Sequence, residues 1–279
     1  MNIKNMITNE RIGYNGRFGN QLFQFASTIG IGKKLGYDVK FPINNINDGI
    51  PHNTADGKSF IAKLNITECF NIDDSFFSNN ITPSYFKNER FFHFDEEMFS
   101  INDKTSINGY FQSEKYFEHC KDEIINILKI KPEILSQSLQ QIPKTNKELV
   151  SIHIRRQDYL VLGDYHSLNG LDYVNSAIKL IGGEENYHFI ICSDDIDWCE
   201  SIWGKNKNFT LIKGNSSYVD FTIMSLCDHH IISNSSFSWW SSYLSKNKNK
   251  KIIAPINWFG PNMGGTILKD LYTKHMVII

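Results

Sequence analysis

The stretch VSIHIRRQDY, residues 150–159, places two adjacent arginines at the end of a segment that is typical of a buried strand. Residues 150–154 are largely β-branched and apolar, which predicts a strand inside a sheet. Ligands of open α/β sheets bind beyond the carboxyl ends of the strands. Arg155 and Arg156 lie at such an end, where a charge is unfavourable unless it meets an opposite one. The stretch therefore predicts either an anion-binding site or a structural network of ion pairs.

The two arginines should have different roles, because consecutive residues of a strand point to opposite faces of the sheet. Arg155 falls on the same side as His153. One arginine should meet the ligand, and the other should pair with a carboxylate such as Asp158. An arginine can grip a phosphate through two parallel hydrogen bonds, so the pattern favours a phosphate-bearing ligand.

Apolar runs and helical spacings alternate through the second half of the chain. We expect further strands at 189–192, 209–212, 230–233 and 251–254, and helices at 172–181, 218–226 and 237–244. Strands that alternate with helices predict a parallel, doubly wound sheet, so the fold class is α/β.

The first half of the chain is less regular. We expect helices at 21–35 and 116–128 and strands at 38–41 and 105–112. Nine phenylalanines between positions 60 and 99 either pack in the core or form an aromatic platform for a sugar. The polar, proline-containing segment 130–147 predicts a domain junction, with a first domain at 1–147 and a second at 148–279. The extreme C-terminus is expected to be able to pack back on the first domain.

Composition excludes several classes of protein. The formal net charge is -1, whereas a nucleic-acid-binding protein usually carries a strong basic excess. Five cysteines without a C-x-x-C pair argue against a disulfide framework or a structural zinc site, and they predict a reducing, cytoplasmic location. No apolar run approaches the length of a membrane span, so a membrane role would be peripheral. Nothing in the sequence indicates an oligomeric state.

A glycine-rich turn, Gly16-Arg17-Phe18-Gly19-Asn20-Gln21, precedes the first expected helix. Glycines let the backbone pass close to a ligand, and the free N–H groups at a helix start attract phosphate. The alternative is a tight turn in which Asn20 caps the helix.

Acidic and serine-rich turns follow two later strands. Ser193-Asp194-Asp195-Ile196-Asp197 contains a D-x-D pattern that could hold a metal on a diphosphate, or could serve as a helix cap. Ser233-Asn234-Ser235-Ser236 offers hydroxyl and N–H groups to a phosphate, or simply caps a helix whose tryptophans are buried. Asp228-His229-His230 has no partner at the spacing of a metal site.

Six segments together resemble glycosyltransferase family 11, the α-1,2-fucosyltransferases. They are GRFGNQLFQFA at 16–26, GYFQSEKYF at 109–117, HIRRQDY at 153–159, CSDDIDWC at 192–199, and SNSSFSWW with IIAPINWFG at 233–240 and 252–260. They follow the family's order across nearly the whole chain. The resemblance implies a GT-B-like fold of two Rossmann-like domains, with an N-terminal acceptor-side domain at 1–147 and a C-terminal GDP-fucose-binding domain at 148–279. It also implies GDP-fucose as donor, a glycan acceptor, inversion at the anomeric carbon, and no cofactor or metal.

The resemblance also assigns residues. It implies that Arg155 contacts the donor diphosphate, with Ser235 and Ser236 near the same phosphates. His153 is expected beside the nucleoside, and Asp220 on guanine. The alternative for Asp220 is a capping box with Ser217, three residues earlier. Arg156 and Asp194 are expected on the donor side as well. Gly16, Arg17, Gly19 and Asn20 would face the cleft from the first domain.

The catalytic base is not indicated by any motif. Asp158 could accept the proton of the attacking hydroxyl, although pairing with Arg156 is an alternative role for it, and Asp164 and His166 are further candidates. The departing diphosphate gains negative charge, which Arg155 could stabilise. Two other functions stay open: a metal-dependent GT-A transferase that uses Asp195 and Asp197, and a non-catalytic sugar-binding module.

Overall fold

The computed structural model describes residues 5–48, 50–53 and 59–279. The chain forms two compact units: the first comprises Met1–Lys131 and Ile267–Thr273, and the second comprises Pro132–Thr266 and Lys274–Ile279. The division lies before Pro132 rather than at the expected 147/148. The reason is a helix, α5 (Pro132–Gln141), whose buried Ser138 hydroxyl donates to the Val219 carbonyl at 3.3 Å and so attaches the segment to the second unit.

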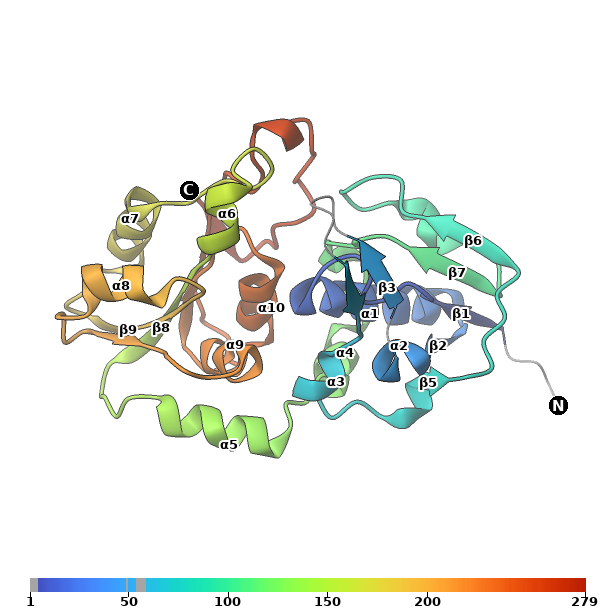
Figure 1. Cartoon of the computed structure of the whole chain (residues 1–279), viewed down its shortest axis with the longest axis horizontal. Helices are drawn as coiled ribbons and strands as arrows, with labels where there is room; N and C mark the ends of the chain where they lie inside the picture. The colour runs from blue at the N-terminus through green and yellow to red at the C-terminus, as the bar shows by residue number, and fades with distance from the viewer. Residues whose placement is uncertain (1–4, 49, 54–58) are drawn as a thin grey trace. The chain divides into compact units, whose positions relative to one another are not determined.

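The sheet of the second unit has six parallel strands in the order β10-β9-β8-β11-β12-β13. Figure 1 labels two neighbouring strands of this sheet, β9 and β8. The strands are β8 (Glu148–Ile154), β9 (Tyr187–Ser193), β10 (Phe209–Leu211), β11 (His229–Ile231), β12 (Ile252–Ala254) and β13 (Met276–Ile278). The chain builds outward from β8 in one direction and then returns to β11 on its other side. This is the doubly wound arrangement expected from the sequence, with its switch point between β8 and β11.

Helices cover both faces of this sheet. Besides α5, they are α6 (Gln157–Val161), α7 (Leu171–Ile181), α8 (Ile196–Trp203), α9 (Ser217–Ser225) and α10 (Ser236–Leu244), with a 3-10 turn at Pro261–Met263. Buried residues of α7 and α8, such as Ile178 and Trp203, pack with Ile152 in one core cluster. Val219 and Met224 of α9 pack with Ile190 in another. The extreme C-terminus forms β13 here, and it is residues 267–273 that belong to the first unit.

The first unit has a five-stranded parallel sheet in the order β5-β2-β1-β7-β6 and a separate antiparallel hairpin, β3-β4. The strands are β1 (Met6–Thr8), β2 (Asp38–Pro42), β3 (Ile50–Asn53), β4 (Ser59–Ala62), β5 (Phe77–Ser78), β6 (Tyr85–Asn88) and β7 (Thr105–Asn108). The helices are α1 (Phe18–Leu35), α2 (Asn44–Asn47), α3 (Ile66–Cys69) and α4 (Lys121–Ile127), with 3-10 turns at Asp74–Phe76, Glu96–Ser100, Glu114–Tyr116 and Glu118–Cys120. Its switch point lies between β1 and β7.

Most phenylalanines of the 60–99 region pack in the core of the first unit. Phe70 is fully buried, and Phe94 and Phe99 pack around the ring of Tyr116. Phe86 and Phe91 are exposed, and the side chain of Phe60 lies outside the described residues. Core packing therefore accounts for most of the region. Among the described residues, no helix is both long enough and apolar enough to cross a membrane.

Candidate active site

The switch point of the second unit is closed by a hydrogen bond between two strand ends. His153 Nδ1, on β8, lies 2.8 Å from the hydroxyl oxygen of Ser233, just beyond β11. His153 is buried, and burial together with the charge of Arg155 lowers its pKa to about 3. The imidazole is therefore neutral at physiological pH and holds the two strand ends in register.

The guanidinium of Arg155, just beyond the end of β8, lies between two carboxylates. Its Nη1 lies 3.0 Å from Asp194 Oδ2, and its Nη2 pairs with Asp158 Oδ2. The expectation that Asp158 pairs with Arg156 was wrong, because α6 begins at Gln157 and carries Asp158 back toward Arg155. Two fixed partners hold the guanidinium in one orientation, and its side chain keeps 21% exposure. Such a group is preorganised for an anion.

Arg156 belongs to a separate contact network. Its Nε donates to Asp195 Oδ2 at 2.9 Å, and its guanidinium carbon lies 4.5 Å from the centre of the Trp198 ring. Its backbone N–H donates to Asp194 Oδ1 at 2.8 Å. Asp194 therefore ties the end of β9 to both arginines. The two arginines share Asp194, but the Arg156 side chain pairs with Asp195 whereas the Arg155 side chain pairs with Asp158 and Asp194.

The two acids of the D-x-D pattern lie in different environments. Asp195 Oδ2 is engaged by Arg156, and Asp197 is exposed in the first turn of α8. Asp195 sits at the N-cap of α8 but makes no side-chain capping bond, so capping does not account for it either. Across the described residues, no group of three or more His, Cys, Asp or Glu side chains is arranged to hold a metal ion.

The side chains of Asp228, His229 and His230 form hydrogen bonds to neighbouring strands of the sheet. Asp228 Oδ2 accepts the N–H of Leu149 at 2.8 Å, and His229 Nδ1 accepts the N–H of Lys251 at 3.0 Å. His230 Nδ1 lies 2.8 Å from the Ser151 hydroxyl, and burial holds its pKa well below the usual range.

The serine turn caps α10, as the simpler interpretation predicted. Ser235 Oγ accepts the N–H of Phe237 at 3.3 Å, and Ser236 is the first helical residue. The N–H of Ser235 donates to the Ser233 carbonyl at 2.7 Å, so the turn presents the positive end of the α10 helix dipole beyond the sheet. Trp239 and Trp240 are fully buried, as expected.

Asn234 connects three segments of the second unit through contacts that the sequence did not predict. It is buried, its Nδ2 donates to the carbonyls of Ser167 and Trp258 at 2.9 and 2.8 Å, and its Oδ1 accepts from Asn169. The hydroxyl of Tyr159 donates to its carbonyl at 2.9 Å. Its position between two strand-end serines was the available signal, but its partners are far away in the sequence.

Asp220 has an uncommitted acceptor. The N-cap of α9 is Ser216, whose hydroxyl accepts the N–H of Val219, so Asp220 lies one position too late for a capping box. Asp220 Oδ1 is buried and has no hydrogen-bond partner among the described residues. Burial raises the pKa of this carboxyl to about 6, and the neighbouring Asn215 side chain offsets part of the shift.

In the first unit, the glycine-rich turn is held by amides. Gly16 has φ +95°, and a Cβ there would lie 2.0 Å from Asn20 Nδ2. Asn20 is not the N-cap: α1 begins at Phe18, and Asn20 Oδ1 instead accepts from Gln112 Nε2 at 2.9 Å. Arg17 is exposed at the N-cap and Gly19 is buried.

Buried Gln24 also fixes this turn, which the sequence did not predict. Its Oε1 accepts the N–H of Gly13 at 3.0 Å, and its Nε2 donates to the Asn15 carbonyl at 2.8 Å. Hydrogen bonds from Gln24 and Gln112 within the first unit therefore fix the backbone and Asn20 of the glycine-rich turn.

The three candidates for the catalytic base occupy different environments. Asp158 is paired with Arg155, and Asp164 is exposed. His166 stacks on the Tyr159 ring at 4.6 Å between centres, and burial lowers its pKa. None of these contacts singles out one of them as the base.

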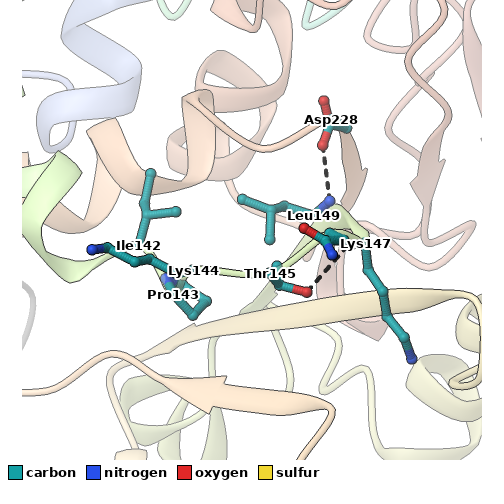
Figure 2. A pocket seen from close by; sticks show the side chains of 8 residues that line it. Ile142, Pro143, Lys144, Thr145, Lys147, Leu149 and Asp228 are labelled. Atoms are coloured by element: carbon teal, nitrogen blue, oxygen red, sulfur yellow. Dashed lines mark hydrogen bonds between the residues drawn. The ribbon is translucent and has the colours of Figure 1, made fainter.

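A surface pocket lies at the opposite edge of the same sheet, where β8 begins. Figure 2 shows the hydrogen bond from the N–H of Leu149 to Asp228 that closes one side of this pocket. The lining also includes residues 142–147. It contains none of the predicted site residues, so it is not the anion site.

Residues 2–266 match the family model described as Glycosyl transferase family 11. The chain belongs to this family. An alpha-1,2-colitosyltransferase of Escherichia coli is 29% identical over 266 residues, covering 88% of this chain and 90% of that protein. The O-antigen biosynthesis glycosyltransferase WbnK of Escherichia coli is 24% identical, covering 91% of this chain and 96% of that protein. Galactoside alpha-(1,2)-fucosyltransferase 1 of Aotus azarae is 24% identical over 54% of this chain and 46% of that protein.

Solved structures share the fold. POFUT1 in complex with GDP superposes with a TM-score of 0.54 at 11% identity, covering 89% of this chain and 98% of that one. POFUT1 in complex with GDP-fucose gives 0.50 at 12% identity, covering 88% and 94%. Together with the two parallel sheets, these similarities establish a GT-B-like fold of two Rossmann-like units. The family is one of glycosyltransferases, so the protein is an enzyme, and neither a GT-A transferase nor a non-catalytic module fits it.

Proposed function

We propose that this glycosyltransferase moves L-fucose from GDP-fucose to the 2-hydroxyl of a terminal β-galactoside, with inversion at the anomeric carbon. The family and the named activities of its relatives support this donor class and linkage. The observation that carries the proposal is Arg155, held by Asp158 and Asp194 at the carboxyl end of β8, at the switch point of the sheet.

Arg155 is the group proposed to stabilise the leaving diphosphate. The acceptor hydroxyl oxygen attacks C1 of fucose and gives up its proton to a general base, the C1–O bond breaks, and its electron pair passes to a phosphate oxygen of GDP. A fixed guanidinium and the hydroxyl groups of Ser235 and Ser236 would stabilise that charge as it develops. Asp158 and Asp194 then act as positioning residues, and His153 holds the strand ends beneath the nucleotide.

We also propose that transfer needs no metal. Arg155 supplies a positive charge where a metal-dependent enzyme would use a cation, and Asp195 is already paired with Arg156. The five free cysteines support action in a reducing compartment such as the cytoplasm.

The test is turnover of GDP-fucose with lactose as acceptor, followed by NMR assignment of the product linkage. We expect the products α-1,2-fucosyllactose and GDP. Most of the activity should remain in the presence of EDTA, and also in the variant Asp197→Asn, which changes an exposed acid of the D-x-D pattern. A parallel reaction with GDP-colitose, whose sugar lacks the 3-hydroxyl of fucose, separates the two donors named among the relatives. Transfer of colitose alone would overturn the assignment of fucose, and activity lost in EDTA but restored by Mn²⁺ would overturn the metal-free mechanism.

A further inference from the structure

Three asparagines form a continuous row of side-chain amides in the first unit. Asn15 Nδ2 donates to Asn108 Oδ1 at 2.9 Å, and Asn108 Nδ2 donates to Asn88 Oδ1 at 2.9 Å. Asn108 ends β7 and Asn88 ends β6, while Asn15 lies in the loop after β1. This amide row therefore follows the carboxyl edge of the sheet beside its switch point, which is where α/β sheets bind ligands.

The row keeps free hydrogen-bonding groups at its exposed end. Asn88 is exposed, and among the described residues its Nδ2 has no hydrogen-bond partner. Gln112 lies outside the row and is buried: its Nε2 donates to Asn20 Oδ1 at 2.9 Å, and its Oε1 has no partner within the described part of the chain. Uncharged amide donors and acceptors at one edge suit sugar hydroxyls better than phosphates.

An aromatic ring is held outward in the turn that follows the row. Glu89 Oε2 accepts the N–H groups of Tyr110 and Phe111 at 3.0 and 2.8 Å, and Glu89 Oε1 accepts from the Tyr116 hydroxyl at 2.9 Å. Gly109 permits this approach, because a Cβ there would lie 2.5 Å from Glu89 Cβ. With its backbone held by Glu89, the residue Tyr110 remains 45% exposed.

The backbone of the turn is strained. Phe111 has φ +53°, a conformation that is unfavourable for a bulky residue by roughly 1–3 kcal/mol. Its ring is fully buried at 5.4 Å from that of Tyr116. Packing alone explains the position of Phe111, but it gives no reason for an exposed tyrosine beside it. Tyr110 follows Asn108 by two residues, and the carbonyl of the intervening Gly109 accepts from Asn15 Nδ2 at 3.5 Å. An exposed ring and a free amide in one segment are the combination that stacks on one face of a sugar and bonds its hydroxyls.

We propose that the amide row and Tyr110 bind the acceptor galactoside, with Glu89 as a positioning residue for the Tyr110 turn. This inference rests on the proposed function for the identity of the sugar. It assigns acceptor recognition to residues outside the glycine-rich turn.

The test measures lactose binding to the full chain without donor, by saturation-transfer NMR titration. Asn108→Ala and Tyr110→Ala should each weaken lactose binding about tenfold or more, and Tyr110→Phe should retain it. Matched controls are Asn102→Ala, near the amino end of β7, and Tyr85→Ala, which is 53% exposed on β6. Both controls should bind lactose as the wild type does. GDP affinity, measured by calorimetry, should be unchanged in every variant and shows that each one is folded.

Normal lactose binding by both Asn108→Ala and Tyr110→Ala would overturn the proposal, as would a wild type that does not bind lactose. Equal weakening in the controls would also overturn it. Failure of the proposed function has a different signature: the wild type would bind lactose at this surface but form no fucosylated product with GDP-fucose.

Discussion

The Nδ1 atom of His153 and the hydroxyl oxygen of Ser233 lie 2.8 Å apart across the switch point of the second unit. A second pair with the same chemistry, Ser151 and His230, lies at 2.8 Å deeper between β8 and β11. The two pairs join the same strands, but only the first stands where the strands end. Strand pairing and ligand positioning can therefore be separated by mutating one hydroxyl at a time.

We expect Ser233→Ala and Ser151→Ala to destabilise the fold by similar amounts, about 1–3 kcal/mol, because each leaves a buried imidazole nitrogen without its partner. Only Ser233→Ala should also weaken GDP binding, since only it loosens the strand ends. Thermal melting and GDP calorimetry on the same samples measure both effects. If Ser151→Ala weakened GDP binding as much as Ser233→Ala does, the hydrogen bond between His153 and Ser233 at the strand ends would have no special role in GDP binding.

Arg155→Ala should reduce the rate of transfer by on the order of 100-fold or more while leaving the fold intact, because one preorganised charge contact is lost. Arg155→Lys should restore little, since an ammonium cannot replace the planar fork that meets Asp158 and Asp194. Initial rates at saturating GDP-fucose measure this.

Arg156→Lys is the matched control for that experiment. Arg156→Lys keeps the charge but disturbs the stacking of the side chain on Trp198. The melting temperature of this variant should therefore fall, while its rate of transfer should change little. Near-normal turnover by Arg155→Lys, or an equal loss of rate in Arg156→Lys, would remove Arg155 from its assigned role.

Glu89 should make stability depend on pH. Burial raises the pKa of its carboxyl from 4.5 to about 7, with the nearby Asp95 adding to the shift and the bonds from Phe111, Tyr116 and Tyr110 opposing it. Asp95 is itself paired with Arg90. Because the folded pKa is raised, the contribution of Glu89 to stability is complete below about pH 4.5 and is lost as pH rises through about 7.

Glu89→Gln removes this titration. The free energy of unfolding of the wild type, from urea titrations between pH 4.5 and 8, should therefore fall relative to that of the variant by on the order of 2 kcal/mol as pH rises. The comparison uses the pH dependence, so a uniform loss of stability in the variant does not affect it. Parallel pH profiles of the two proteins would show that Glu89 is not a buried titrating group.

The second unit was predictable because its signals are local. The apolar spacing of 172–181 predicted α7, which spans Leu171–Ile181, and the β-branched run at 150–154 predicted β8. The first unit offered weaker signals: β1 and β5 are only three and two residues long. Strands this short are defined by pairing with distant segments, such as Ile7 with Val39 and Thr105, and periodicity cannot show that. The junction was misplaced because α5 is polar on most of its surface and its partner, α9, lies far along the chain.

In the candidate site, too, local sequence signals were predictable and long-range pairings were not. Arg155 was found because two arginines after a strand are conspicuous in the sequence. Its partner Asp194 belongs to another strand end, so the pairing became visible only in the structure. The assignment of Asp158 to Arg156 failed for a local reason, because the direction of α6 decides which arginine the carboxylate meets.

Asp220 offers the sharpest test of base recognition. Guanine presents N1–H and its N2 amino group side by side, and an ionised carboxylate can accept both. Asp220→Asn turns one acceptor into a donor, and an unpaired donor in a closed site is unfavourable by roughly 1–3 kcal/mol. GDP affinity should fall at least about tenfold. Melting temperature should barely change, because Ser216 rather than Asp220 caps α9.

The pH dependence of GDP binding provides the independent readout. Because the pKa of Asp220 is raised to about 6, its carboxylate accepts guanine donors only above that pH, so wild-type affinity should rise as pH increases through 6. The terminal phosphate of GDP titrates in a similar range, so Asp220→Asn is needed to isolate the contribution of the carboxyl. Asp172→Asn, an exposed acid in the first turn of α7, is the matched control and should bind GDP normally. Calorimetric titrations between pH 5 and 8 that give the same pH profile for the wild type and Asp220→Asn would show that Asp220 does not contact the base.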